Sequence, residues 1–433
     1  MKTKLLLLLL LANFSIYAQY TNIPDINFEN KLIALGIDTA IPDGKVQTDK
    51  IDKLTYLDIS NSSIVDLTGI QDFVSLTTLY CYGNQLTSLD VSKNIALVSL
   101  GCSDNQLASL DVSMNTALKD LYCNSNQLTS LDISKNTALE NLACENNQLA
   151  TLDVSKNTAF KYLYCYSNQL TALDVSTNIS LIELVCDSNQ LTSLDVSMNT
   201  FLKLLFCSSN QLTTLDISMN TVLKNLYCTD NQLTTLDVSK NTALETLSCY
   251  SNQLTSLNVS KNTTLKDLYC YSNQLTTLDV SKNTTLISLF CGSNQLTNLN
   301  LKNGKNTFLN YMNCIQNSNL SCIQVDDISY SNTNWNKDAT ATYSLNCPSL
   351  GIAETVFGKI AVYPNPAKGE LHIDNSTLEK ATIYDTLGRL ITITKFTNGS
   401  NNNTINLAGF RSGIYYIYLE NEGATIVKKI IVE

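Results

Sequence analysis

Histidine is nearly absent from this sequence, and charged side chains are scarce. The only histidine, His372, lies near the C-terminal end, and Asp, Glu, Lys and Arg together make up 15% of the 433 residues. Zinc sites and catalytic triads usually depend on histidine, so we expect no metal site, no cofactor and no enzyme activity. The net charge of −10 argues against a nucleic-acid partner, because phosphate groups attract basic surfaces.

Long apolar runs are also missing beyond the N-terminus. Lys2 and Lys4 precede an apolar run at Leu5–Leu11, and Ala18 suits the position before a cleavage site. The run is too short to span a bilayer, which takes about 18 or more apolar residues, and no later run reaches that length. We therefore predict a signal peptide over residues 1–18, no transmembrane segment in the mature chain, and an extracellular or outer-surface location.

What the sequence has in abundance is a repeat of 21 residues. Cysteine marks each copy, at Cys81, Cys102, Cys123, Cys144, Cys165, Cys186, Cys207, Cys228, Cys249, Cys270 and Cys291. Asparagine follows each cysteine three residues later, at Asn84, Asn105, Asn126, Asn147, Asn168, Asn189, Asn210, Asn231, Asn252, Asn273 and Asn294. A fixed period of this length is typical of a solenoid, in which each unit covers the apolar face of its neighbour.

Alternation within each unit predicts how the coil is built. Around Tyr80, the side chains of Leu79 and Cys81 should face the core while the tyrosine faces solvent. Successive coils would stack such short strands into a parallel sheet. Leu86, Leu89 and Val91 would line the opposite wall, where no helical pattern fits and short extended or 3₁₀ segments are expected. The fold class is therefore a β-rich repeat solenoid with a parallel sheet.

The repeat resembles the leucine-rich repeat family, whose pattern is Leu-x-x-Leu-x-Leu-x-x-Asn-x-Leu. Leu76, Leu79, Cys81, Asn84 and Leu86 occupy these places, with cysteine at one leucine position. The resemblance covers residues 54–322 and implies that the parallel sheet forms a concave face. The opening coil has 22 residues, which resembles the internalin subclass.

Both ends of the array depart from the repeat, as the ends of a solenoid must. Residues 19–53 are predicted to form an N-terminal cap, in which Asp25 begins a short helix and Phe28, Leu32, Ile33 and Leu35 form its apolar face. Residues 323–350 are predicted to form a C-terminal cap that closes the core with Trp335. Cys322 and Cys347 lie outside the cysteine repeat, so we expect a disulfide between them in an exported protein.

The rest of the chain has another composition. After a linker at 351–357, residues 358–433 alternate apolar strands with Gly, Asn and Asp turns, which predicts a small β-sandwich. The stretch resembles the C-terminal sorting domain of the type IX secretion system, through the sequences Tyr-Pro-Asn-Pro at 363–366, Gly-Ile-Tyr-Tyr at 413–416 and Lys-Lys-Ile-Ile-Val at 428–432. The resemblance implies a partner in the outer-membrane secretion machinery. An ordinary adhesive β-module is the alternative.

The repeated polar residues are best interpreted as scaffold. A buried asparagine amide can satisfy backbone groups of its own and the adjacent coil. The cysteines suggest a redox or metal site, but neighbouring strands lie about 4.8 Å apart, whereas a disulfide brings its Cβ atoms within about 3.8 Å. We therefore expect the cysteines to pack as small apolar side chains. A row of aspartates faces outward opposite the strands, at Asp90, Asp111, Asp132, Asp153, Asp174, Asp195, Asp216 and Asp237, and is interpreted as structural, with calcium binding as the alternative.

Function is expected where the copies differ. The outward strand positions are rich in aromatic residues, at Tyr80, Tyr82, Tyr122, Tyr162, Tyr164, Tyr166, Phe206, Tyr227, Tyr250, Tyr269, Tyr271 and Phe290. Aromatic side chains on a rigid surface favour recognition of a protein ligand, as in adhesion, although tyrosine also suits cross-strand packing. A glycan ligand and a structural spacer without a ligand are the alternatives.

Overall fold

The computed structural model describes residues 19–347, 361–374, 378–396, 402–421 and 424–433. The predicted signal peptide at 1–18 and linker at 351–357 lie outside these ranges. The chain divides into two compact units, Met1–Leu345 and Asn346–Glu433, and each is described by itself.

The first unit begins with a small cap. Strands β1 (Tyr20–Asn22) and β2 (Lys45–Gln47) pair antiparallel, and helix α1 (Ile26–Ala34) lies between them in the sequence. Helix α2 (Thr48–Ile51) precedes the first coil. Asp25 caps α1 as predicted, accepting from the amides of Asn27 and Phe28, and its second oxygen accepts from Val65 and Asp66 in the first coil. One expectation is wrong: Leu35 is 46% exposed, because the helix ends at Ala34 and Leu35 turns away in the C-cap.

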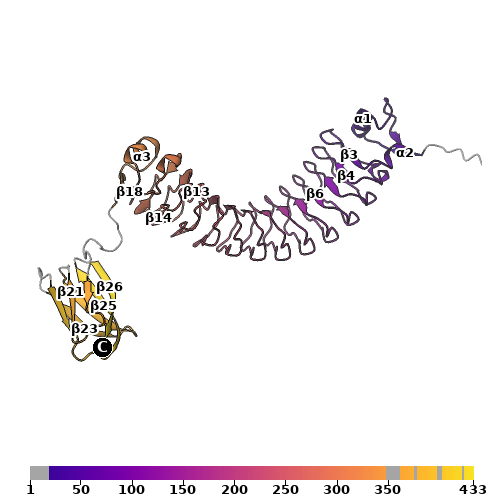
Figure 1. The fold of residues 1–433 in the computed structure, drawn as a ribbon. Helices are drawn as coiled ribbons and strands as arrows, with labels where there is room; N and C mark the ends of the chain where they lie inside the picture. Colours follow the sequence, from indigo (N-terminus) through magenta and orange to yellow (C-terminus); the bar gives the residue numbers. More distant parts are fainter. Residues whose placement is uncertain (1–18, 348–360, 375–377, 397–401, 422–423) are drawn as a thin grey trace, which may run out of the picture. The chain divides into compact units, whose positions relative to one another are not determined.

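The repeats form a parallel sheet along the inner side of a curved solenoid (Figure 1). In order, the strands of this stretch are β3 (Tyr56–Asp58), β4 (Thr78–Tyr80), β5 (Ser99–Gly101), β6 (Asp120–Tyr122), β7 (Asn141–Ala143), β8 (Tyr162–Tyr164), β9 (Glu183–Val185), β10 (Leu204–Phe206), β11 (Asn225–Tyr227), β12 (Thr246–Ser248), β13 (Asp267–Tyr269), β15 (Ser288–Phe290) and β17 (Tyr311–Asn313). The register places equivalent residues side by side, for example Leu79 beside Leu100. We call this sheet the strand wall.

The opposite side of each coil, from residues such as Leu86 to Val91, is called the return wall. It is mostly irregular, with 3₁₀ turns η1 (Ile70–Asp72) and η2 (Asn306–Phe308). Towards the C-terminal end it becomes a second parallel sheet, made of β14 (Thr277–Asp279), β16 (Asn298–Asn300), β18 (Cys322–Gln324) and β19 (Thr342–Ser344). The expectation of short extended or 3₁₀ segments is confirmed. Leucine, cysteine and valine side chains from both walls fill one continuous core.

Asparagine side chains stabilise each coil on the strand side. The amide of Asn189 donates to the carbonyls of Cys186 in its own coil (3.2 Å) and of Cys165 in the preceding coil (3.1 Å). Its Oδ1 accepts from the Leu170 amide at 3.0 Å. The residue before each ladder asparagine turns the chain with a positive φ, as at Ser188 (52°), so the amide hydrogen bonds hold a backbone conformation that serine rarely adopts.

A second asparagine ladder runs along the return side, and our sequence interpretation missed it. Its members are fully buried and spaced 21 residues apart, at Asn94, Asn115, Asn136, Asn157, Asn178, Asn199, Asn220, Asn241, Asn262 and Asn283. The Asn199 amide donates to the carbonyls of Val175 (3.0 Å) and Asn178 (2.9 Å), both in the preceding coil. Its Oδ1 has no hydrogen-bond partner among the described residues. The signal was present, since these asparagines recur as regularly as those after cysteine.

A second cap closes the C-terminal end of the solenoid. Helix α3 (Ile328–Asn334) precedes Trp335, whose indole Nε1 donates to the Leu309 carbonyl at 2.8 Å while the ring lies 6% exposed. Cys322 and Cys347 are disulfide-bonded, whereas the repeat cysteines and Cys314 are free. Trp335 therefore belongs to the continuous core of the solenoid and is held there by its bond to the Leu309 carbonyl.

The second unit contains two antiparallel sheets. One consists of β20 (Ala361–Tyr363), β21 (Glu370–Asp374) and β24 (Asn402–Asn406). The other consists of β23 (Leu390–Lys395), β22 (Lys380–Asp385), β25 (Gly413–Asn421) and β26 (Ala424–Val432). Leu371 and Ile373 of the first sheet share a core with Ile383 and Ile417 of the second. The described residues thus form a small β-domain, as expected.

Candidate binding face on the strand wall

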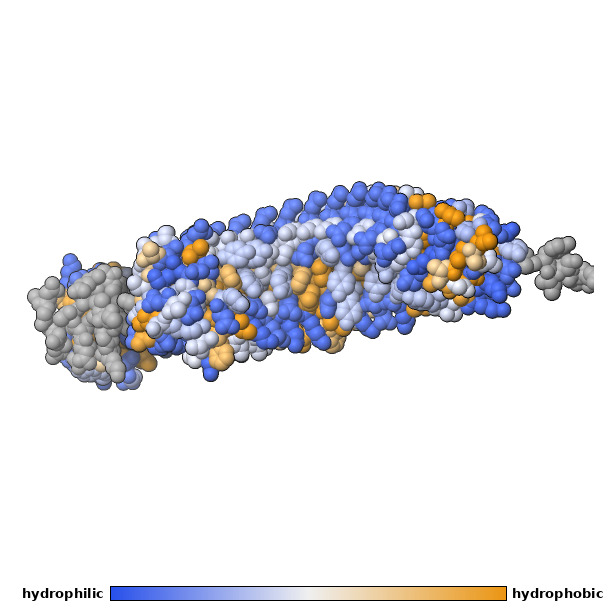
Figure 2. All heavy atoms as spheres, turned by 90° about the horizontal axis from the view of Figure 1, so that it is seen from above, coloured by the Kyte–Doolittle hydropathy of each residue, from blue (hydrophilic) through white to orange (hydrophobic). Residues whose placement is uncertain are grey.

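The outward side chains of the strand wall form rows that run along the solenoid. We call this surface the strand face: the first and third residues of each strand, and the residue after each repeat cysteine. In the coil that contains β4 these are Thr78, Tyr80 and, beyond the strand, Tyr82. The predicted aromatic residues all lie in these rows. Figure 2 views the solenoid from this side and shows a mainly hydrophilic surface with separate hydrophobic patches.

Most of the aromatic rings are only partly exposed. Tyr82 (38%) and Tyr122 (37%) are the most accessible of the predicted set, and the other rings are half-buried. Rings in adjacent coils contact each other: Phe206 and Tyr227 have centroids 4.2 Å apart, and Tyr250 stacks on Tyr271 at 4.3 Å. The rings are therefore fixed before any ligand arrives, and part of their surface contributes to packing between coils.

Small residues in the same rows make room for the rings. Gly101 follows Tyr80 in its row, and a Cβ at that glycine would lie 2.8 Å from Tyr80 Cδ1. Ala143, Val185 and Ser248 alternate with aromatic residues further along and are themselves buried. At these positions a small residue lies beside a large ring, so part of the variation between copies serves packing between coils.

The rings border a groove on the C-terminal half of the strand face. Its volume is about 620 Å³, and its lining consists of Asp187, Ser188, Phe206, Ser208, Ser209, Tyr227, Thr229, Asp230, Ser248, Tyr250, Tyr269 and Tyr271. A smaller hollow of about 280 Å³ lies between Tyr122, Tyr162 and Tyr164. The structure thus brings Phe206, Tyr227, Tyr250, Tyr269 and Tyr271 together in one site. Tyr80 and Tyr82 lie near the other end of the wall.

The strand face also carries carboxylates, which our sequence analysis did not single out. Burial raises the pKa of Asp187 to about 6, against hydrogen bonds from Ser208. Glu145 is 9% exposed, and burial raises its pKa as well. The Tyr164 hydroxyl donates to Glu183 Oε2 at 2.6 Å. A signal existed in the sequence: between Thr78 and Gln316, no lysine or arginine occupies the strand face or the position before a ladder asparagine.

Basic residues gather instead in the row just before the strands, which we call the rim row. Glu140 lies between Lys119 (3.5 Å) and Lys161 (2.6 Å). Glu245 lies between Lys224 (3.0 Å) and Lys266 (2.7 Å), and hydrogen bonds from both lysines lower its pKa to about 2. The carboxylates of the rim row therefore have cationic partners.

The repeat cysteines face away from this surface, into the core. All are fully buried, and burial raises their thiol pKa, to about 12 for Cys249. A thiol with such a pKa is a poor nucleophile and a poor metal ligand at neutral pH. Within the described ranges, no group of three or more His, Cys, Asp or Glu side chains is placed to hold a metal ion.

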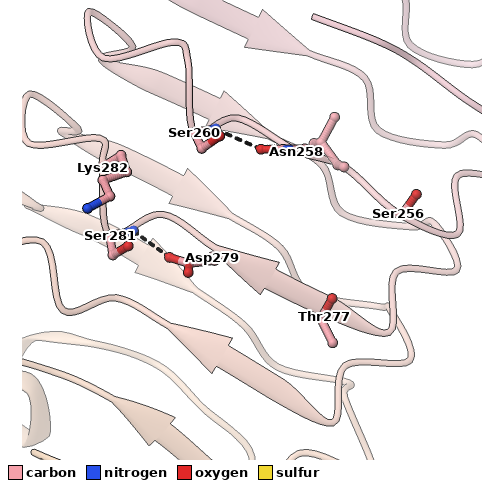
Figure 3. Close-up of a pocket in the computed structure, with 8 residues that line it drawn as sticks. Ser256, Asn258, Ser260, Thr277, Asp279, Ser281 and Lys282 are labelled. Atoms are coloured by element: carbon pink, nitrogen blue, oxygen red, sulfur yellow. Dashed lines mark hydrogen bonds between the residues drawn. The ribbon is translucent and has the colours of Figure 1, made fainter. Parts of the chain in front are cut away.

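The aspartate row of the return wall has a structural use. Asp195 Oδ1 accepts from the Ser197 amide two residues later at 2.9 Å, and the same bond recurs in the other coils. Figure 3 shows it beside a depression of about 420 Å³, where Asp279 accepts from Ser281 and Asn258 accepts from Ser260. Because asparagine can replace aspartate there, the row needs a side-chain acceptor more than it needs a charge.

Both units are similar to known proteins. Residues 361–433 match the family described as "Secretion system C-terminal sorting domain". Internalin J of Listeria monocytogenes serotype 4b (strain F2365) is 39% identical over 71 residues, which are 16% of this chain and 8% of that protein. Among the described residues, no helix has the length and apolar character needed to cross a membrane.

Solved structures share the solenoid. The functional domain of InlJ from Listeria monocytogenes, which includes a cysteine ladder, superposes with a TM-score of 0.65 at 28% identity, over 96% of this chain and 99% of that one. The internalin InlF of strain 4b F2365 gives a TM-score of 0.61 at 22% identity, over 76% of this chain and 96% of that one. The first unit is therefore an internalin-like leucine-rich repeat solenoid with a cysteine ladder, and the second carries a type IX secretion C-terminal sorting domain.

Proposed function

We propose that this exported leucine-rich repeat protein binds a protein ligand through its strand face. The observation that carries the proposal is the groove at Phe206 and Tyr227, where fixed aromatic rings border an accessible hollow of about 620 Å³. Rigid aromatic side chains bring contact area at low entropic cost, which is why they dominate binding energies at interfaces. The aspartate row and the cysteine ladder are occupied by the scaffold, so the strand face is the surface left for recognition.

The test is a triple substitution of Tyr164, Phe206 and Tyr227 by alanine in the full chain. We expect binding to a panel of extracellular proteins to weaken at least about tenfold, because each ring removed costs roughly 1 kcal/mol or more. The matched control replaces Met198, Phe201 and Val222, which are exposed outside the strand face, and should bind as the unaltered protein does. Circular dichroism confirms that both variants remain folded.

A glycan ligand is the second candidate, because the groove combines stacked Tyr250 and Tyr271 rings with the hydroxyls of Ser208 and Thr229. Including oligosaccharides in the panel separates the two. Binding of an oligosaccharide and of no protein would contradict the proposal in favour of a glycan. Attachment that the triple variant leaves unchanged would instead support a spacer without a ligand on this face.

A further inference from the structure

The charges in the groove are all of one sign. Asp187 and Asp230 line it, and no lysine, arginine or histidine of the described ranges does. The Ser208 amide donates to Asp187 Oδ1 at 2.6 Å. Neither aspartate forms an ion pair within the described residues. The groove therefore presents negative charge that the chain itself does not neutralise.

In the rim row, by contrast, lysines of neighbouring coils neutralise the carboxylates. Glu140 and Glu145 belong to one coil and lie five residues apart. Glu140 contacts two lysines, whereas Glu145 has no ion pair and its buried Oε2 has no hydrogen-bond partner within the described residues. An unpaired buried carboxylate is costly for the free protein, and a positive charge supplied from outside removes that cost.

Aromatic rings lie next to these carboxylates. Tyr166 follows Glu145 and precedes Asp187 in the row of residues after the repeat cysteines. The three coils are adjacent, since the Asn146 amide donates to the Tyr166 carbonyl and the Ser167 amide donates to the Asp187 carbonyl. Burial raises the pKa of Tyr166, and the charges of Glu145 and Asp187 raise it further, so both carboxylates act on this side chain. The face of a tyrosine ring attracts ammonium and guanidinium groups. Carboxylates with rings between them thus suit a cationic side chain better than a neutral one.

Building on the proposed function, we propose that the protein partner presents a lysine- or arginine-rich segment to the strand face, with one cationic side chain against Asp187. A basic segment is favoured because its positive charges complement the two aspartates that line the groove. A second copy of the chain is disfavoured, since both would carry a net charge of −10. A divalent metal would need more ligands than the two carboxylates of the groove.

The experiment measures binding of short fluorescent peptides to the full chain by polarisation. One peptide alternates lysine with serine, a second replaces lysine with glutamate, and a third replaces it with threonine. The variant Asp187→Asn keeps an acceptor for the Ser208 amide, so the fold is retained. The matched control is Asp195→Asn, which removes one charge from the return wall, where Asn258 already shows that asparagine is accommodated.

We expect the lysine peptide to bind and the other two not to. Asp187→Asn should weaken binding of the lysine peptide about tenfold, and Asp195→Asn should change it by less than about twofold, because exposed charges are screened by salt. Equal weakening by both variants would show attraction by net charge alone and overturn the proposal. So would failure of the lysine peptide to bind, or a calcium-induced rise in melting temperature that Asp187→Asn abolishes.

The partner found in the panel of extracellular proteins separates this inference from the proposed function. If the triple aromatic variant loses that partner while Asp187→Asn keeps it, the basic segment is wrong and recognition by the strand face stands. If both variants keep the partner, both proposals fall. If both lose it and Asp195→Asn does not, both are supported.

Discussion

The strand wall and the return wall belong to the same coils, yet their outward side chains follow opposite rules. On the return wall the same aspartate recurs from coil to coil, because each copy performs the same local task of capping a serine amide, as Asp195 does for Ser197. On the strand wall the corresponding positions hold tyrosine, glycine, glutamate or serine. Sameness therefore marks side chains that serve their own coil. Side chains that differ between copies occupy positions where the backbone of the coil does not require a particular hydrogen bond.

The two asparagine ladders also differ between the strand side and the return side of the coil. Within the part of the chain that the structure describes, Asn189 on the strand side hydrogen-bonds through both its amide and its carbonyl oxygen, while Asn199 on the return side hydrogen-bonds only through its amide. Both are buried. The strand side therefore has more side-chain hydrogen bonds per coil, which hold the backbone beneath a surface whose outward residues differ from copy to copy.

Replacing these asparagines gives the largest expected effect. Asn189→Ala leaves the buried Leu170 amide without its acceptor and removes one of two asparagine hydrogen bonds from the carbonyls of Cys165 and Cys186, so it should lower the free energy of unfolding by about 1–3 kcal/mol. Asn199→Ala removes one hydrogen bond from each of the Val175 and Asn178 carbonyls, which still accept from backbone amides, so its cost should be smaller. Urea unfolding followed by circular dichroism measures both, with the exposed Thr200→Ala as control. An unchanged midpoint for Asn189→Ala would contradict the role of this ladder.

Much of this architecture could be predicted because repetition converts local patterns into long-range ones. The spacing of Cys81 and Cys102 already states which strands are neighbours, and alternation around Leu79 states which side is the core. The groove could not be predicted in the same way. It depends on how far Phe206 leans onto Tyr227 and how deeply Asp187 is buried, and these follow from packing between unlike side chains.

Replacing one aspartate on each wall should change the stability less than replacing the asparagines does, and the sign of the change depends on pH. The pKa of Asp187 is raised from 3.8 to about 6, so its contribution to stability is greatest below pH 4 and is lost as the pH rises through 6. Asp187→Asn should therefore stabilise the protein at pH 7, by about 1 kcal/mol, and change little at pH 4.

Asp195 behaves in the opposite way. Its pKa is lowered by hydrogen bonds from Ser197, so its contribution is present at neutral pH and is lost on acidification. Asp195→Asn should not stabilise the protein at pH 7, because asparagine keeps the capping bond and loses only the charge. Urea midpoints of both variants at pH 4 and pH 7 check this contrast. Stabilisation at pH 7 by both substitutions would indicate relief of general charge repulsion instead.

Calcium should have the smallest effect of all, on either wall. Each return-wall aspartate is exposed, offers one carboxylate per coil, and already uses Oδ1 to accept a serine amide, as Asp216 does from Ser218. Calcium requires about six to eight oxygen ligands, which neighbouring coils supply only one at a time. We expect millimolar calcium to leave the melting temperature unchanged, with magnesium at equal ionic strength as control. A calcium-specific rise that Asp195→Asn and Asp216→Asn together remove would show that this constant row binds a ligand, and that sameness along a solenoid can serve a site as well as a scaffold.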